Sequence, residues 1–170
     1  MMEQKISSLS FNEQKELKPK IEDFILECLD GETQKAALDF VAYVKSMKMT
    51  PRWVHRNAWD VRYKNGGVCK IYVWDSGWLI RPSFNYNYDD ALMAFLAENK
   101  LEEIIWNNIG HCRACQKSRC AIKSKIILGK EFKDVCKCVL FQFQNPNPAT
   151  IECAKKLIDY RRTTISNLLE

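Results

Sequence analysis

The chain has 170 residues, 46% of them hydrophobic and 11% aromatic, and a formal net charge of +5 at pH 7. This composition provides enough apolar side chains for a folded core and excludes an intrinsically disordered chain. The sequence has no apolar run of about 18 residues, the length that a membrane span needs. Residues 1–18 also lack the apolar centre of a signal peptide. We therefore expect a cytoplasmic protein that does not enter a membrane.

Two helices are predicted in the first part of the chain, after a polar arm over residues 1–18. Pro19 suits the first turn of a helix, and apolar residues between Ile21 and Leu29 follow at helical spacing. A second helix is expected from Glu32 to Met47. It ends before Pro51, because the residue that precedes a proline is disfavoured in the helical conformation.

The middle of the chain changes to strand-like patterns. Three segments rich in aromatic and β-branched residues are predicted to be strands: Trp59–Tyr63, Val68–Trp74 and Trp78–Arg81. Tight-turn residues separate them, with Asn65-Gly66-Gly67 after the first and Asp75-Ser76-Gly77 after the second. This arrangement favours an antiparallel meander.

The last third contains a short helix after Asp89-Asp90, then strands over Lys125–Gly129 and Val139–Phe143. Asn147 and Pro148 are a suitable N-cap and first residue for a closing helix. The predicted fold class is α+β: an antiparallel meander with N-terminal helices packed on it, a cysteine-rich metal-anchored lobe and a C-terminal helix. We expect three parts, namely the polar arm 1–18, an α+β domain 19–110 and a zinc-anchored lobe 111–170 packed on the same domain.

Five of the eight cysteines lie between His111 and Cys138. Cys112 and Cys115 form a C-x2-C pair, which can hold a soft cation between two thiolates on one turn. Cys120 supplies a third thiolate, and either Cys136 or Cys138 can complete a tetrahedral site. His111 is an alternate ligand, although its position beside Cys112 makes their geometries compete. The pattern predicts a structural zinc site.

Other uses of these cysteines remain open. An iron–sulfur cluster is the second candidate, although the C-x2-C-x4-C order matches ferredoxin-type spacings only in part. A redox dithiol is the third, because nearby cations can lower the pKa of a thiol. Cys28, Cys69 and Cys153 stand apart in apolar surroundings and are predicted to be inert core residues.

The cysteine segment also carries the positive charge of the chain. Between His111 and Cys138, eight Lys and Arg residues face only Glu131 and Asp134, a local charge of +6. Four thiolates around Zn²⁺ carry a net charge of −2, so these cations can serve as compensation. The alternative is that the basic segment binds nucleic acid.

Tryptophans and arginines gather in the predicted sheet. We consider a pocket for a small ligand, with the aromatic rings as walls and the guanidinium groups as partners for an anion. Its candidate residues are Trp53, Trp59, Trp74, Trp78, Arg62 and Arg81. The alternative is that the aromatic rings simply pack in the core. Catalysis has little support, since His55 is the only histidine outside the cysteine segment and belongs to no catalytic motif.

Two groups of residues resemble known bacterial families. The first resembles small α+β domains of the YdhG-like kind: Thr50-Pro51-Arg52-Trp53, Asn57-Ala58-Trp59, Lys64-Asn65-Gly66-Gly67 and Gly77-Trp78. The second resembles C-terminal cysteine segments, some of which accompany GyrI-like ligand-sensing domains: Cys112-x2-Cys115-x4-Cys120, Ile127–Phe132, Val135-Cys136 and Asn145-Pro146. The resemblance spans residues 35–160, implies a metal-binding accessory or sensing role, and favours Cys136 over Cys138 as the fourth ligand. It transfers no activity. The resulting expectation is a ligand-binding or regulatory domain with structural zinc, and a nucleic-acid-binding protein is the alternative.

Overall fold

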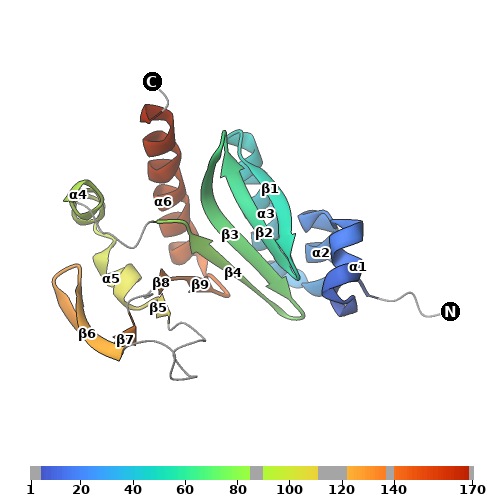
Figure 1. Cartoon of the computed structure of the whole chain (residues 1–170), viewed down its shortest axis with the longest axis horizontal. Coiled ribbons are helices and arrows are strands. Elements are labelled where there is room, and N and C mark those ends of the chain that lie inside the picture. Colours follow the sequence, from blue (N-terminus) through green and yellow to red (C-terminus); the bar gives the residue numbers. More distant parts are fainter. Residues whose placement is uncertain (1–4, 85–89, 111–121, 137–139, 169–170) are drawn as a thin grey trace. The chain divides into compact units, whose positions relative to one another are not determined.

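The computed structural model of the protein describes residues 5–84, 90–110, 122–136 and 140–168 (Figure 1). These residues confirm the predicted α+β class, with N-terminal helices, an antiparallel sheet and a C-terminal helix. The helical elements are η1 (Ile6–Ser8), α1 (Phe11–Leu17), α2 (Ile21–Cys28), α3 (Gly31–Ser46), α4 (Asp90–Glu98), α5 (Glu102–Trp106) and α6 (Pro148–Asn167). Across the described ranges, no helix is both long enough and apolar enough to span a bilayer.

The chain divides into two compact units, Met1–Ser83 with Gln144–Glu170, and Phe84–Phe143. We call them the sheet unit and the hairpin unit. These limits differ from the expected division after residue 110. Helix α6 belongs to the sheet unit, while α4 and α5 belong to the hairpin unit.

The main sheet has the strand order β1-β2-β3-β4-β9. Its strands are β1 (Thr50–His55), β2 (Ala58–Tyr63), β3 (Gly66–Trp74), β4 (Gly77–Pro82) and β9 (Phe143–Gln144). The first four form an antiparallel meander, as the sequence predicted for the last three of them. The added strand is β1, which was not predicted because Pro51 was interpreted as the end of the preceding helix. A proline is tolerated there because β1 is an edge strand.

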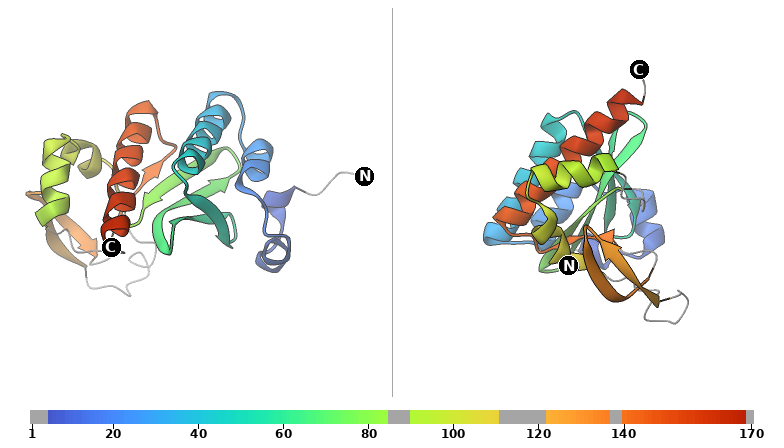
Figure 2. Two further views of the ribbon diagram at one scale, coloured as in Figure 1. Left: turned by 90° about the horizontal axis from the view of Figure 1, so that it is seen from above. Right: turned by 90° about the vertical axis from the view of Figure 1, so that its left-hand side faces the viewer.

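The helices of the sheet unit cover one face of this sheet. Phe24 of α2 packs edge-to-face on Trp59 with ring centroids 5.0 Å apart, and Phe40 of α3 lies 5.8 Å from the ring of Trp78. Figure 2 shows α3 and α6 on the same side of the strands. Gly66 allows this close packing, because a Cβ there would stand 2.6 Å from Cδ1 of Ile165 in α6 and the isoleucine side chain would have to move.

The N-terminal arm is more ordered than its polar sequence suggests. Ser10 and Glu13 form a reciprocal capping box at the start of α1. The carboxylate of Glu27 in α2 accepts hydrogen bonds from the backbone N–H groups of Ile6 and Ser7, at 2.8 and 3.0 Å. These contacts attach η1 and α1 to the rest of the sheet unit.

The hairpin unit contains α4, α5 and two small two-stranded sheets. Strands β5 (Ile109–Gly110) and β8 (Leu140–Phe141) form one, and β6 (Ile122–Ile127) and β7 (Lys130–Cys136) form the other. Leu128 and Gly129 connect β6 to β7, both with positive φ, the backbone conformation that a tight hairpin turn requires. The indole N–H of Trp106 in α5 donates to the carbonyl of Ile127 at 2.9 Å.

Candidate ligand-binding face

The pairing of strands β1 to β4 separates their side chains into two faces. Trp53 lies opposite Trp59, which lies opposite Ile71, and Ile71 lies opposite Ile80. Directly paired residues share a face, so these residues belong to the face that α2 and α3 cover. The remaining positions form a second set, which we call the polar face. Its polar and aromatic members are Arg52, Asp60, Arg62, Lys70, Tyr72, Trp74 and Arg81, and the pairing places Ala58, Gly77 and Leu79 on the same side.

A row of charged side chains crosses the polar face. Arg52, Asp60, Lys70 and Arg81 are successive cross-strand partners on β1, β2, β3 and β4. Arg62 joins the row from β2, with its Nε 3.7 Å from Oδ2 of Asp60 and its Nη2 donating to the carbonyl of Asn65 at 2.8 Å. Four cations against one carboxylate give this group a net charge of +3. The row therefore creates a positive potential on this side of the sheet.

Arg62 is the most informative member of the row. Its Nε is buried, and it has no hydrogen-bond partner among the described residues. The 3.7 Å separation from Asp60 is an ion pair but is too long for a hydrogen bond. An unsatisfied buried donor costs free energy, and the ion pair with Asp60 offsets part of this cost.

Two aromatic side chains stand beside the row on β3. Tyr72 is half-buried, and Cζ of Arg81 lies 5.0 Å from the centre of its ring, within the range of a cation–π contact. Nη1 of Arg81 also donates to the Tyr72 hydroxyl at 3.3 Å. These two contacts fix the ring against a cation.

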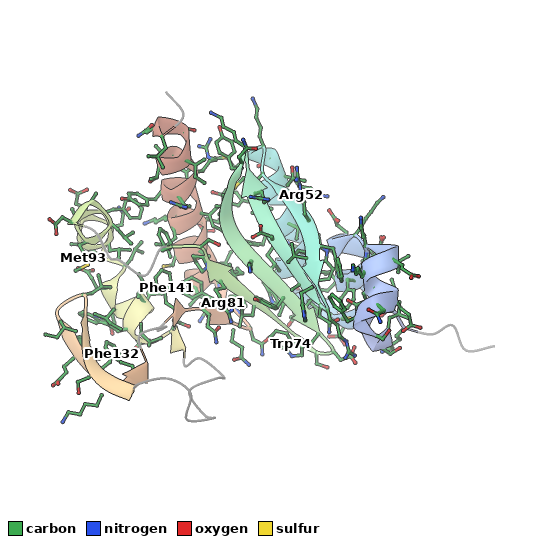
Figure 3. The ribbon with its side chains drawn as sticks, viewed as in Figure 1. Arg52, Trp74, Arg81, Met93, Phe132 and Phe141 are labelled. Atoms are coloured by element: carbon green, nitrogen blue, oxygen red, sulfur yellow. The ribbon has the colours of Figure 1, made fainter. Side chains whose placement is uncertain are left out.

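Trp74 is held in a different way. It is paired with Gly77 across the β3–β4 turn, and a Cβ on Gly77 would stand 2.6 Å from the indole Nε1. The glycine therefore lets the indole lie against the backbone of β4, which a larger residue would prevent. Figure 3 shows Arg52, Arg81 and Trp74 at separate places along the sheet.

The structure does not bring the six predicted pocket residues together. Trp53, Trp59 and Trp78 belong to the helix-covered face, where Trp59 and Trp78 are each 1% exposed. Arg62, Trp74 and Arg81 belong to the polar face. As a set, the six residues do not line one surface. For Trp59 and Trp78, core packing is the role that the structure supports.

The sequence interpretation also missed part of the polar face. Asp60, Lys70 and Tyr72 were not among the predicted site residues, although the alternation in β3 contains the necessary signal. Cys69, Ile71 and Val73 are buried apolar residues, so the intervening Lys70, Tyr72 and Trp74 must point the other way.

No family model, curated protein or solved structure matches this chain.

Most of the predicted metal site lies outside the described residues. This applies to His111, Cys112, Cys115, Cys120 and Cys138. Cys136 ends strand β7, where its Cα pairs with that of Ile122 at the start of β6. Within the described ranges, no group of three or more His, Cys, Asp or Glu residues is arranged to hold a metal ion.

The other three cysteines have the predicted inert character. Cys28, Cys69 and Cys153 are free and buried. Burial raises the pKa of Cys28 and of Cys153 to about 11, and it raises the pKa of Cys69 further. A thiol that stays protonated at neutral pH is a poor nucleophile and a poor metal ligand. The structure thus confirms their assignment to the core.

Proposed function

We propose that the protein is a binding module whose polar face takes an anionic ligand that carries a planar ring. The observation behind this proposal is that the cation row and the two aromatic side chains share one face of the sheet. Cations attract and orient an anion, whereas an aromatic ring offers a stacking surface for a planar group.

We choose three probes: adenosine monophosphate, inorganic phosphate and adenosine. The monophosphate carries both an anionic group and a planar ring, whereas inorganic phosphate has only the first and adenosine only the second. Titration calorimetry at low salt should give a higher affinity for the monophosphate than for either part alone. Equal binding of inorganic phosphate would eliminate the role of the aromatic side chains. The absence of binding for all three would overturn the proposal.

Lys70→Gln should weaken binding of the monophosphate by about tenfold, the usual effect of losing one hydrogen bond to a charged group. Lys35→Gln is a matched control, since Lys35 lies on α3 with its side chain 68% exposed and pairs there with Asp39. This control removes the same charge but leaves the polar face intact. If the two variants bind equally weakly, the loss reflects net charge and the assigned site is wrong.

We also propose that the cysteine segment binds structural zinc through Cys112, Cys115, Cys120 and Cys136, with Cys138 and His111 as alternates. The pairing of Ile122 with Cys136 supports this ligand set. Cys120 precedes Ile122 by two residues, and two residues of extended chain reach about 7 Å. A chain of this length permits Cys120 and Cys136 to be ligands of the same ion.

Elemental analysis of protein purified under reducing conditions should find one zinc ion per chain. Cys120→Ser and Cys136→Ser should each lower this zinc content, whereas Cys28→Ser should leave it unchanged because Cys28 is a core residue. A coloured preparation that contains iron would favour the cluster alternative. Protein with neither metal would refute the proposal.

We propose that this binding role operates in the cytoplasm. A reducing compartment keeps thiols available for metal binding. The free state of Cys28, Cys69 and Cys153 supports this placement.

A further inference from the structure

The polar face is wider than one mononucleotide needs. The cation row crosses four adjacent strands, and three strand spacings span about 14 Å. A single phosphate can contact only part of such a row at one time. The length of the row therefore points to a ligand with several phosphates in succession.

The aromatic side chains are also duplicated. Tyr72 and Trp74 are two residues apart on β3, so their backbone positions differ by about 7 Å along the strand. Tyr72 contacts Arg81, whose strand position lies opposite Lys70, whereas Trp74 lies against Gly77 at the end of β3. Both rings lie in the last three residues of β3, and each is held by a different neighbour, which suits the stacking of two separate bases.

Asp60 adds a negative charge to this face, which a site for phosphate alone does not need. Its carboxylate lies within the row, between Arg52 and Lys70 in the strand pairing and beside Arg62. A carboxylate repels phosphate but accepts hydrogen bonds from N–H groups on base edges, such as the ring N3–H of uracil and thymine. It therefore favours a ligand that presents base edges to the sheet.

We propose that the ligand of the polar face is single-stranded nucleic acid of at least two nucleotides. This inference rests on the proposed binding role of that face. The cation row follows the phosphates, Tyr72 and Trp74 each stack one base, and Asp60 lies within reach of a base edge. A sheet that presents aromatic and basic side chains on one face binds unpaired bases, which a duplex keeps stacked inside the helix.

The test uses the full chain and a fluorescein-labelled oligouridylate of about eight nucleotides, within the range of single-strand sites on comparable folds. Anisotropy titrations should give at least tenfold tighter binding of the oligonucleotide than of uridine monophosphate. The logarithm of the affinity should fall with the logarithm of salt concentration with a slope of about −2 to −3, as expected for three or four phosphate contacts. Comparison with an oligothymidylate of the same length shows whether the face prefers RNA or DNA.

Three variants separate stacking from charge. Tyr72→Leu and Trp74→Leu should each weaken oligonucleotide binding by about fivefold to a hundredfold while leaving the salt slope unchanged. Asp60→Asn should strengthen binding of the oligonucleotide, because it removes the only negative charge of the polar face. This gain cannot result from misfolding. Phe11→Leu is the aromatic control, as Phe11 is 40% exposed on α1, outside the polar face, and it should bind normally.

The outcomes distinguish this inference from the broader proposal. If uridine monophosphate binds as tightly as the oligonucleotide, the single-strand inference is overturned and the binding role of the face survives. Equal affinity for a duplex of the same length would also overturn it. If Phe11→Leu weakens binding as much as Tyr72→Leu and Trp74→Leu, the nucleic acid binds elsewhere.

Discussion

Gln14 is a fully buried polar residue that joins three segments of the sheet unit. Its side-chain N–H group donates to the carbonyl of Ile6 at 3.1 Å and to Oδ1 of Asn57 at 2.8 Å. Its amide oxygen accepts from the backbone N–H of Asn57 at 3.0 Å. The side chain thereby ties the N-terminal arm to the turn between β1 and β2, where Asn57 has a positive φ.

Gln14→Ala should lower the free energy of unfolding by about 3 kcal/mol. The substitution leaves the partner groups of Ile6 and Asn57 unsatisfied and opens a cavity. Urea denaturation followed by circular dichroism measures the change. Lys15→Ala, at the exposed next position of α1, should change stability by less than about 0.5 kcal/mol. Equal effects of the two substitutions would mean that the arm does not contribute to folding stability.

The sequence allows some of these single-residue roles to be predicted. Cys28, Cys69 and Cys153 sit in apolar surroundings, and their burial follows from that context. The burial of Gln14 could not be predicted in the same way. A glutamine in a polar arm usually faces solvent, and its partner Asn57 lies 43 positions away in the sequence.

Among the elements, strands with regular alternation were easier to predict than charged strands. The aromatic and β-branched residues of β2, β3 and β4 allowed these three strands of the meander to be predicted. The fourth strand, β1, was not predicted. Strand β7 was missed because Lys130, Glu131 and Lys133 are exposed and interrupt its apolar pattern.

The polar face could be only partly predicted, because its composition depends on strand register. The β2–β3 loop consists of Lys64 and Asn65, and Gly66 and Gly67 belong to β3. The pairing also shifts between Val61 and Arg62, which skips Val68 of β3. Each of these details changes which residues share a face. Trp59 and Trp74 were grouped together although Trp59 pairs with Ile71, which lies on the face opposite to Trp74.

Helix α6 begins as its sequence predicts, and its cap can be tested. The side chain of Asn147 accepts a hydrogen bond from the backbone N–H of Thr150 at 2.9 Å, and Pro148 follows in the first turn. Asn147→Ala should lower the free energy of unfolding by about 1 kcal/mol, because an N-terminal donor of the helix loses its partner. Thermal and urea denaturation measure the loss.

Asn147→Ser is the matched control for this helix, since a serine hydroxyl can accept the same hydrogen bond and should preserve most of the stability. If Asn147→Ser destabilises the protein as much as Asn147→Ala, the side-chain cap is not the source of the effect.

At the scale of the whole molecule, the cysteines divide between the two compact units. Cys28, Cys69 and Cys153 belong to the sheet unit, whereas the five cysteines from Cys112 to Cys138 belong to the sequence range of the hairpin unit. The first group is buried as neutral thiols in an apolar core. The proposed metal chemistry is thereby confined to one unit, and the proposed polar face to the other.

The buried thiols of the sheet unit make its stability depend on pH. Burial raises the pKa of Cys153 to about 11, whereas an unfolded chain exposes a thiol with a pKa near 8.5. Above that value the unfolded chain releases a proton that the folded protein retains, so rising pH favours unfolding. The contribution of Cys153 to stability is complete below about pH 8.5 and should be lost progressively as pH rises toward 11.

The comparison of the natural chain with Cys153→Ala isolates this effect from other groups that titrate at high pH. Urea denaturation at about pH 8 and about pH 10.5 should show that the stability difference between the two proteins shrinks at the higher pH, because only the natural chain has a Cys153 thiol that loses its proton on unfolding. Lysine and tyrosine ionisation acts on both proteins and cancels in the difference. A stability difference that is the same at both pH values would show that Cys153 is not held neutral in the core.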